Sequence, residues 1–288
     1  MGTNSVREVM RRTAVPLPSV AKQLQIASIG SFYLRSGGVT GSLGLPLKNV
    51  QFAGDGSGNR HFAGGRVQFL RNSPRKIEQI NVRVRFVGFH THGESNELSA
   101  SDEPYFIIGV AATNGSKTVR FGPYENVDKD EDRSEATLVC DVSDGLTPPI
   151  VLAVIGMEND EGDPEEAEKK VRDIMNSVVS KVEEAAGAIG AFSGEHFVIP
   201  EGWRDVLIGW GAEAVAAILG LGDDLIDKAH RVLFDFDPEL DEWKKLPKLG
   251  DHLGNPFNVT LRVKQENEGD HTLFFNVDLF RQTIEPLG

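Results

Sequence analysis

The side chains in this sequence that are best suited to chemistry are carboxylates, and they gather in short segments. Four groups occur: Glu94, Glu97, Asp102 and Glu103; Asp128, Asp130, Asp132 and Glu135; Glu158, Asp160, Glu161 and Asp163; and Asp223 with Asp224. Calcium takes about six to eight oxygen ligands, several of them carboxylates, from flexible loops. We therefore predict that the chain binds Ca²⁺, with the following candidate ligands: Glu97, Asp102, Glu158, Asp160, Asp163, Asp223, Asp224, Asp128, Asp130 and Asp132.

One of these groups, from Asp128 to Asp132, places three aspartates at alternate positions, as the start of an EF-hand loop does. The rest of the segment departs from that pattern, because Arg133 stands where an EF-hand needs glycine and Val139 where it needs glutamate. Flanking helices are not predicted either. We therefore exclude an EF-hand. A local cation site at Asp128, Asp130 and Asp132 stays an alternative to a site shared by several loops.

His90 and His92 stand at alternate positions, so in a strand they share one face, with Glu94 next in phase. Zinc and iron accept such ligands, which makes a metal-dependent hydrolase the enzymatic alternative. The simpler interpretation is that these histidines begin a polar loop. The sequence has no Ser–His–Asp arrangement with a nucleophile elbow, and its one cysteine, Cys140, stands in an apolar strand pattern. We therefore predict that the chain is not an enzyme.

The acidic groups separate segments that have the pattern of β-strands. Val82, Val84 and Phe86 alternate with polar or less apolar positions, and Phe89 continues the apolar face less regularly. Short apolar runs of strand length follow, and two alternating segments joined by a polar hairpin loop at 264–270 come near the end. The predicted strands span residues 80–89, 105–111, 117–121, 136–140, 150–155, 229–236, 257–263 and 271–280.

Between the fifth and sixth predicted strands the period changes to that of helices. From Glu165 to Ile189 apolar residues recur at steps of three or four, and Asp163 and Pro164 provide an N-cap and a first-turn proline. A second apolar stripe runs from Trp203 to Leu221. We predict a helical hairpin that packs on the strands or on a partner subunit. Its small residues leave a membrane-active hairpin of a toxin-like protein as the alternative.

This order lacks an alternation of strand and helix, which excludes Rossmann and TIM-barrel folds. We predict a mainly β protein, an antiparallel β-sandwich over residues 79–288 with a helical hairpin inserted at about 164–221. Residues 1–78 are rich in Gly and Ser and are predicted to form an arm or a small β region. A helix over residues 7–24 is cut short by Pro16 and Pro18.

Three motifs resemble the C2 domain family. The segment VRVRFVGFHTHGESNELSASDEPYFIIGV, residues 82–110, is similar to a strand, an acidic loop and the next strand entry of that family. LAVIGMENDEGD at 152–163 resembles its third loop, and GDDLI at 222–226 resembles the segment that closes this loop, although Asp227 stands where the family has glycine. The resemblance implies a sandwich that binds calcium at one tip and docks on an anionic membrane or on a protein. The helical insertion lies inside the third loop, where it can displace a membrane-contact surface.

Charge and composition limit the partners. The 288 residues carry a formal net charge of −13, and binding to phosphate backbones needs clustered Lys and Arg, so nucleic acid is excluded as a partner. A single cysteine excludes an internal disulfide. We expect neither a signal peptide nor a transmembrane helix, because no apolar run has the required position or length. The sequence does not decide the location, which stays open between the cytoplasm and export by a non-classical route.

Overall fold

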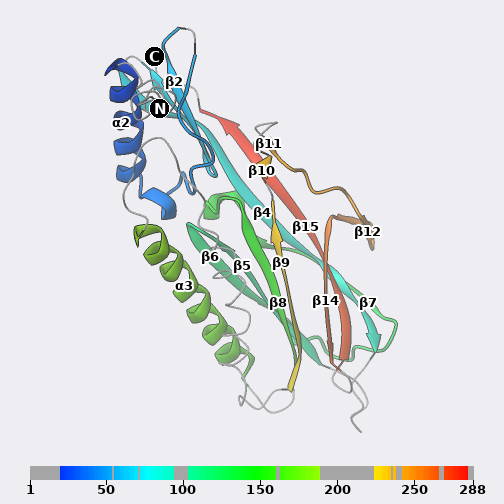
Figure 1. Cartoon of the computed structure of the whole chain (residues 1–288). Coiled ribbons are helices and arrows are strands. Elements are labelled where there is room, and N and C mark those ends of the chain that lie inside the picture. The colour runs from blue at the N-terminus through cyan, green and yellow to red at the C-terminus, as the bar shows by residue number, and fades with distance from the viewer. Residues whose placement is uncertain are drawn as a thin grey trace, which may run out of the picture.

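The computed structural model describes residues 20–53, 55–70, 72–93, 103–159, 163–188, 224–234, 236–237, 242–265 and 269–284. In this part of the chain the protein is mainly β, with antiparallel pairing between all neighbouring strands of its two larger sheets (Figure 1). The predicted fold class, a mainly β protein with antiparallel sheets, is therefore confirmed.

The larger sheet has seven strands in the order β1-β2-β3-β4-β15-β14, with β7 also paired to β4. Its centre is the long strand β4: β15 follows one edge, while β3 and β7 occupy successive stretches of the other. The strands are β1 (Gln51–Phe52), β2 (Gly58–Phe62), β3 (Gly65–Leu70), β4 (Ser73–Gly93), β7 (Asp132–Cys140), β14 (Val259–Gln265) and β15 (Gly269–Thr283).

A bulge in β4 explains the irregular apolar pattern of its sequence. Phe86 pairs with Phe275 and Gly88 pairs with Phe274, so one residue of β4, Val87, has no partner on β15. A bulge of this kind shifts the alternation by one position. The shift turns Phe89 to the same inner face as Phe86, and both side chains are fully buried.

The smaller sheet has four strands in the order β6-β5-β8-β9. Its two central strands are buried along their whole length, because each is covered on both faces. Such strands need continuous apolar runs instead of alternation, which is why YFIIGVA and IVLAVI read as strands. The four are β5 (Pro104–Ala112), β6 (Gly115–Phe121), β8 (Ile150–Glu158) and β9 (Asp224–Leu233).

The main core lies between the two sheets. Its aromatic centre joins Phe86 and Phe89 of β4 to Phe106 of β5 and Phe121 of β6. The ring centroids of Phe86 and Phe121 lie 4.9 Å apart, as do those of Phe89 and Phe106. These tilted and edge-on pairs contribute about 0.5–1.5 kcal/mol each beyond the area they bury.

Helix α3 (Pro164–Ala188) covers the other face of the smaller sheet and makes a third layer (Figure 1). Its start follows the sequence prediction: Asp163 Oδ1 accepts hydrogen bonds from the backbone N–H of Glu165 at 2.9 Å and of Glu166 at 3.3 Å. One stripe of the helix, with Ala167, Val171 and Met175, is buried against β5 and β8. Helix α3 thus packs on the sandwich itself. The second predicted helix, 203–221, lies outside the described residues.

Helix α3 lies in the stretch of chain between two neighbouring strands, β8 and β9. β8 and β9 are antiparallel partners, and the last residue of β8, Glu158, pairs with the first of β9, Asp224. The chain therefore leaves the sheet and re-enters it at adjacent positions. Among the helices that the structure describes, none is long and apolar enough to cross a membrane.

The segment before β4 contains α2 (Val20–Arg35), the 3₁₀ turn η1 (Gly38–Thr40) and the β2–β3 hairpin, which pairs with the start of β4. These elements have a small core of their own, formed by the side chains Ile29, Tyr33, Leu43, Phe62 and Val67. The helix predicted over residues 7–24 overlaps α2 only from Val20, and residues 1–19 are not described.

All predicted strands differ from the structure at one end or both, and in two of them the change is more than an extension. The strand predicted at 229–236 begins earlier, at Asp224, and ends at Leu233, because Phe234 has a left-handed φ of 68°. The strand predicted from Phe257 is two pieces, β13 (Asn255–Phe257) and β14, separated by Asn258. The remaining short elements are η2 (Val142–Asp144), β10 (Phe236–Asp237), β11 (Glu242–Trp243) and β12 (Gly250–His252).

Candidate functional site

Three strand ends of the smaller sheet meet at one tip of the sandwich. Pro104, the first residue of β5, pairs with Glu158, the last of β8, and Glu158 pairs with Asp224, the first of β9. Adjacent strands lie about 4.8 Å apart. Three of the acidic segments singled out in the sequence thus begin or end on neighbouring strands, and we call this place the β5–β8–β9 tip.

A network of hydrogen bonds ties the start of β5 to the end of β8. Glu158 is 4 % exposed, and its Oε1 accepts a hydrogen bond from the backbone N–H of Glu103 at 2.6 Å. Asn159 donates two hydrogen bonds to Glu103. Its backbone N–H donates to the Glu103 carbonyl at 3.3 Å, and its side-chain amide donates to Glu103 Oε2 at 3.0 Å. Glu158 therefore already fixes the relative position of the two strand ends.

Of the other candidate ligands from these three acidic segments, only Asp163 has a described side chain. Glu97, Asp102, Asp160 and Asp223 lie outside the described residues, and of Asp224 only the backbone is described. Asp163 acts as the N-cap of α3, since one of its oxygens accepts two backbone hydrogen bonds.

The aspartates from 128 to 132 lie beside the larger sheet, and their described contacts differ from one another. The backbone N–H of Asp128 donates to Glu131 Oε2 at 3.0 Å, and that of Asp130 donates to the Thr91 carbonyl at 2.8 Å. Asp132 begins β7. Within the described residues, no three His, Cys, Asp or Glu side chains form a group that could hold a metal ion.

Asp132 instead binds histidines on the outer face of the larger sheet. Its Oδ1 lies 3.0 Å from His90 Nδ1 and 3.6 Å from His252 Nδ1. The ring of His252 stacks on Phe274 of β15, with the centroids 4.4 Å apart, and its Nε2 bonds to the Arg133 carbonyl at 3.0 Å. These contacts hold the β12–β13 hairpin against the sheet.

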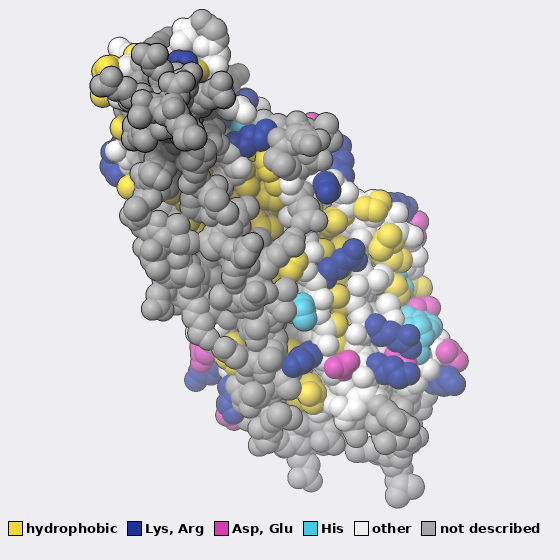
Figure 2. Space-filling model, viewed as in Figure 1, with side chains coloured by type: hydrophobic (Ala, Val, Ile, Leu, Met, Phe, Trp, Pro, Cys, Tyr) yellow, Lys and Arg dark blue, Asp and Glu magenta, His cyan; other side chains and the backbone are white. Residues whose placement is uncertain are grey.

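His92 lies next to His90, with ring centroids 4.5 Å apart, and hydrogen-bonds to Thr272 Oγ1 at 2.9 Å. Partial desolvation, together with the neighbouring His90 and Arg262, lowers the pKa of His92 below its usual value. Figure 2 shows this exposed patch, where histidines mix with basic and acidic side chains near β7 and β12. A hydrogen-bonded surface cluster accounts for the described contacts of both sequence-predicted histidines.

Cys140 behaves as the sequence predicts for an apolar strand position. The residue is buried in the main core at the end of β7. Desolvation raises the pKa of its thiol to about 12. The thiol is therefore protonated at neutral pH and is a poor nucleophile.

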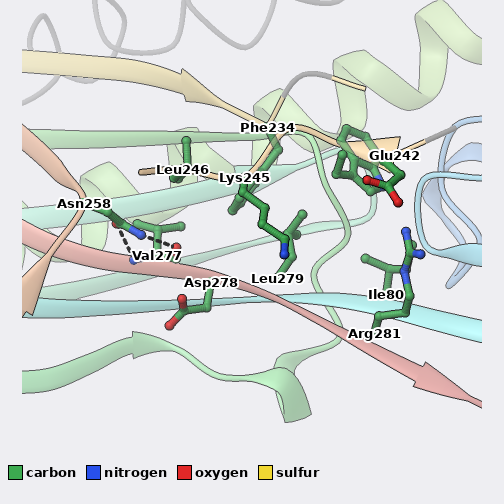
Figure 3. Close-up of a pocket in the computed structure, with 11 residues that line it drawn as sticks. Ile80, Phe234, Glu242, Lys245, Leu246, Asn258, Val277, Asp278, Leu279 and Arg281 are labelled. Atoms are coloured by element: carbon green, nitrogen blue, oxygen red, sulfur yellow. Dashed lines mark hydrogen bonds between the residues drawn. The ribbon is translucent and has the colours of Figure 1, made fainter. Parts of the chain in front are cut away.

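The structure also contains a cavity that the sequence analysis missed. It has a volume of about 480 Å³ and lies between the inner face of the larger sheet and the segment after β9 (Figure 3). The residues that this segment contributes to the cavity lie between Phe234 and Leu246. A second cavity of about 150 Å³ shares Ile80, Trp243 and Arg281 with the first, so the two adjoin. The larger cavity is lined by Ile80, Phe234, Glu242, Trp243, Lys245, Leu246, Asn258, Val277, Asp278, Leu279 and Arg281.

Comparison with known proteins gives no assignment: no protein-family model matches the chain, and no curated protein matches it significantly in sequence. The fold defines the protein's class as a mainly β protein with two antiparallel sheets and a helical layer.

Proposed function

We propose that the chain is a calcium-binding β-sandwich module whose cation site lies at the β5–β8–β9 tip, and that it acts by binding and not by catalysis. The observation that supports the proposal is the register Pro104–Glu158–Asp224 across three adjacent strands. In the sequence, Asp102 and Asp160 stand within two residues of Pro104 and Glu158. The proposal thus brings carboxylates from three segments to one end of one sheet.

Charge repulsion explains why a cation is needed there. Two carboxylates at contact distance repel each other by about 1–4 kcal/mol at surface-like dielectric. Several such groups on neighbouring strand ends destabilise the fold unless a counter-charge is bound, and Ca²⁺ prefers carboxylate oxygens in flexible loops. The resemblance to C2 domains extends the proposal to partners: an anionic membrane surface or a protein that contacts the occupied tip.

The proposal predicts that calcium stabilises the protein. A cation that binds only the native state adds about 2.7 kcal/mol at a hundredfold excess over its dissociation constant, so the melting temperature should rise by several degrees with Ca²⁺ and fall with a chelator. Asp160→Asn should remove most of this difference. Asp173→Asn, which changes an exposed carboxylate on α3, should leave it intact. A melting temperature that does not respond to calcium, in protein shown to be metal-free, would contradict the proposal.

The histidine cluster provides the test against the hydrolase alternative. Replacing His90 and His92 together by Asn should leave the calcium-dependent rise in melting temperature unchanged, because calcium prefers oxygen ligands. Elemental analysis of the purified protein and of this double variant is the companion measurement. Stoichiometric zinc or iron that the two substitutions remove would favour a metal-dependent hydrolase over a calcium module.

A further inference from the structure

The two adjoining cavities differ in character. The larger one has apolar walls on both sides: Ile80, Val277 and Leu279 come from the sheet, and Phe234, Trp243 and Leu246 come from the segment after β9. Figure 3 shows residues of β15 and of this segment facing each other across the cavity, with Lys245 and Arg281 among the polar groups around it. The other lining residues are polar, namely Glu242, Lys245, Asn258, Asp278 and Arg281. A volume of about 480 Å³ lies in the range of small-molecule sites, and the mixed lining favours a ligand with an apolar part and a polar end.

The smaller cavity contains hydrogen-bond donors that lack acceptors. Trp243 is 7 % exposed, and its indole Nε1 is buried without a hydrogen-bond partner in the described part of the chain. The Nε of Arg66, on β3, is also buried without one among these residues. Both side chains line the smaller cavity. Because both groups can only donate, the molecule that satisfies them must supply an acceptor.

The charges of the smaller cavity make this acceptor an anion. Arg281 and Glu78 line it together and form an ion pair, with Arg281 Nε 3.3 Å from Glu78 Oε1. Their charges cancel, and the positive charge of Arg66 is left. The larger cavity shares Arg281 and adds Lys245, Glu242 and Asp278, so over the two cavities together three cations and three carboxylates balance. The smaller cavity by itself keeps one excess positive charge, at Arg66.

We propose that the adjoining cavities bind an aliphatic carboxylate, with its carboxylate in the smaller cavity on Trp243 Nε1 and Arg66 and its chain in the larger cavity on Ile80, Val277 and Leu279. Both cavities share Trp243 and Ile80, so one molecule can occupy them together. This site lies on β3, β4, β15 and the segment after β9, and its ligand is independent of the calcium proposal.

The experiment is a calorimetric titration of the full chain with decanoate in the presence of a chelator, which keeps any calcium site empty. One decanoate per chain should bind. Decanol and decylammonium, which have the same chain without the anion, should bind at least about tenfold more weakly. The decanol hydroxyl can accept a hydrogen bond but has no charge to pair with Arg66, and the decylammonium group has no acceptor at all. Equal affinity for decanol would overturn the proposal, as would the absence of decanoate binding.

Two variants test the assigned groups. Trp243→Phe keeps the aromatic wall but removes the indole N–H, and Arg66→Gln removes the charge. Each should weaken decanoate binding by about tenfold or more. Arg85→Gln, on the exposed side of β4, should leave the affinity unchanged. Circular dichroism checks that each variant is folded, and if Arg66→Gln fails to fold, Trp243→Phe decides. Unchanged affinity in the folded variants would overturn the proposal.

Discussion

Replacing Gly88 by alanine is expected to destabilise the folded protein by about 3–5 kcal/mol, a large loss for a single methyl group. Gly88 lies at the bulge of β4 and has a φ of 145°, a backbone conformation that side chains with a Cβ rarely adopt. A Cβ there would lie 2.0 Å from the Arg133 carbonyl oxygen of β7 and 3.0 Å from the ring of His252. The strand β7 and the β12–β13 hairpin would both have to move.

Urea unfolding of Gly88→Ala measures this loss, and the same strand provides the control. Gly93, at the end of β4, is extended without a positive φ, and the nearest atom to a Cβ there is 3.8 Å away. Gly93→Ala should therefore change the free energy of unfolding by no more than about 0.5 kcal/mol. Similar stabilities for the two alanine variants would show that the close approach of β7 to Gly88 is not required by the fold.

The strands could be predicted because their patterns are local. The runs YFIIGVA and IVLAVI lie in β5 and β8, and alternation identified the central part of β4 and most of β15. The length of β4 could not be predicted in this way. Its first residues pair with β3 and its last with β15, so its ends depend on partners far away in sequence. The bulge at Gly88 was visible only as a break in the alternation before Phe89.

The β5–β8–β9 tip could also be inferred in outline, because acidic segments that follow or precede strands must lie at sheet ends. The contacts at that tip could not. Glu158 accepts a backbone hydrogen bond from Glu103, and Asp163 caps a helix, and both roles depend on the local backbone. The cavities carried no sequence signal, since their walls join residues near 66, 80, 243 and 280.

Protonation of one side chain, His271, is expected to cost the folded protein about 3 kcal/mol of stability between pH 6.5 and pH 4. Its imidazole is fully buried in the main core, edge-on to Phe89 and Phe106, and its Nδ1 hydrogen-bonds to the buried Thr91 hydroxyl at 3.1 Å. Burial lowers the pKa of His271 from 6.5 to about 4; nearby Asp270 opposes this shift, and His92 adds to it.

Proton linkage explains why the free energy of unfolding decreases as the pH falls. Below pH 6.5 the imidazole is protonated in the unfolded chain but stays neutral in the folded one until about pH 4, so the unfolded state binds more protons. The contribution is therefore fully present above pH 6.5 and is lost as the pH falls, by about 1.4 kcal/mol for each unit of pKa difference.

Urea unfolding of the wild type and of a Thr91→Val/His271→Met double variant at pH 7 and pH 4 isolates this contribution. The double variant removes both hydrogen-bonding groups, so it leaves no buried hydroxyl without its imidazole. The carboxylates titrate in both proteins and cancel in the comparison, so the wild type should lose about 3 kcal/mol more than the variant over this range. A direct check is the NMR titration of the His271 ring protons, which should stay at their neutral shift down to about pH 5. A ring that titrates near pH 6.5 in the folded protein would mean that His271 is solvated and that the sandwich opens at this end.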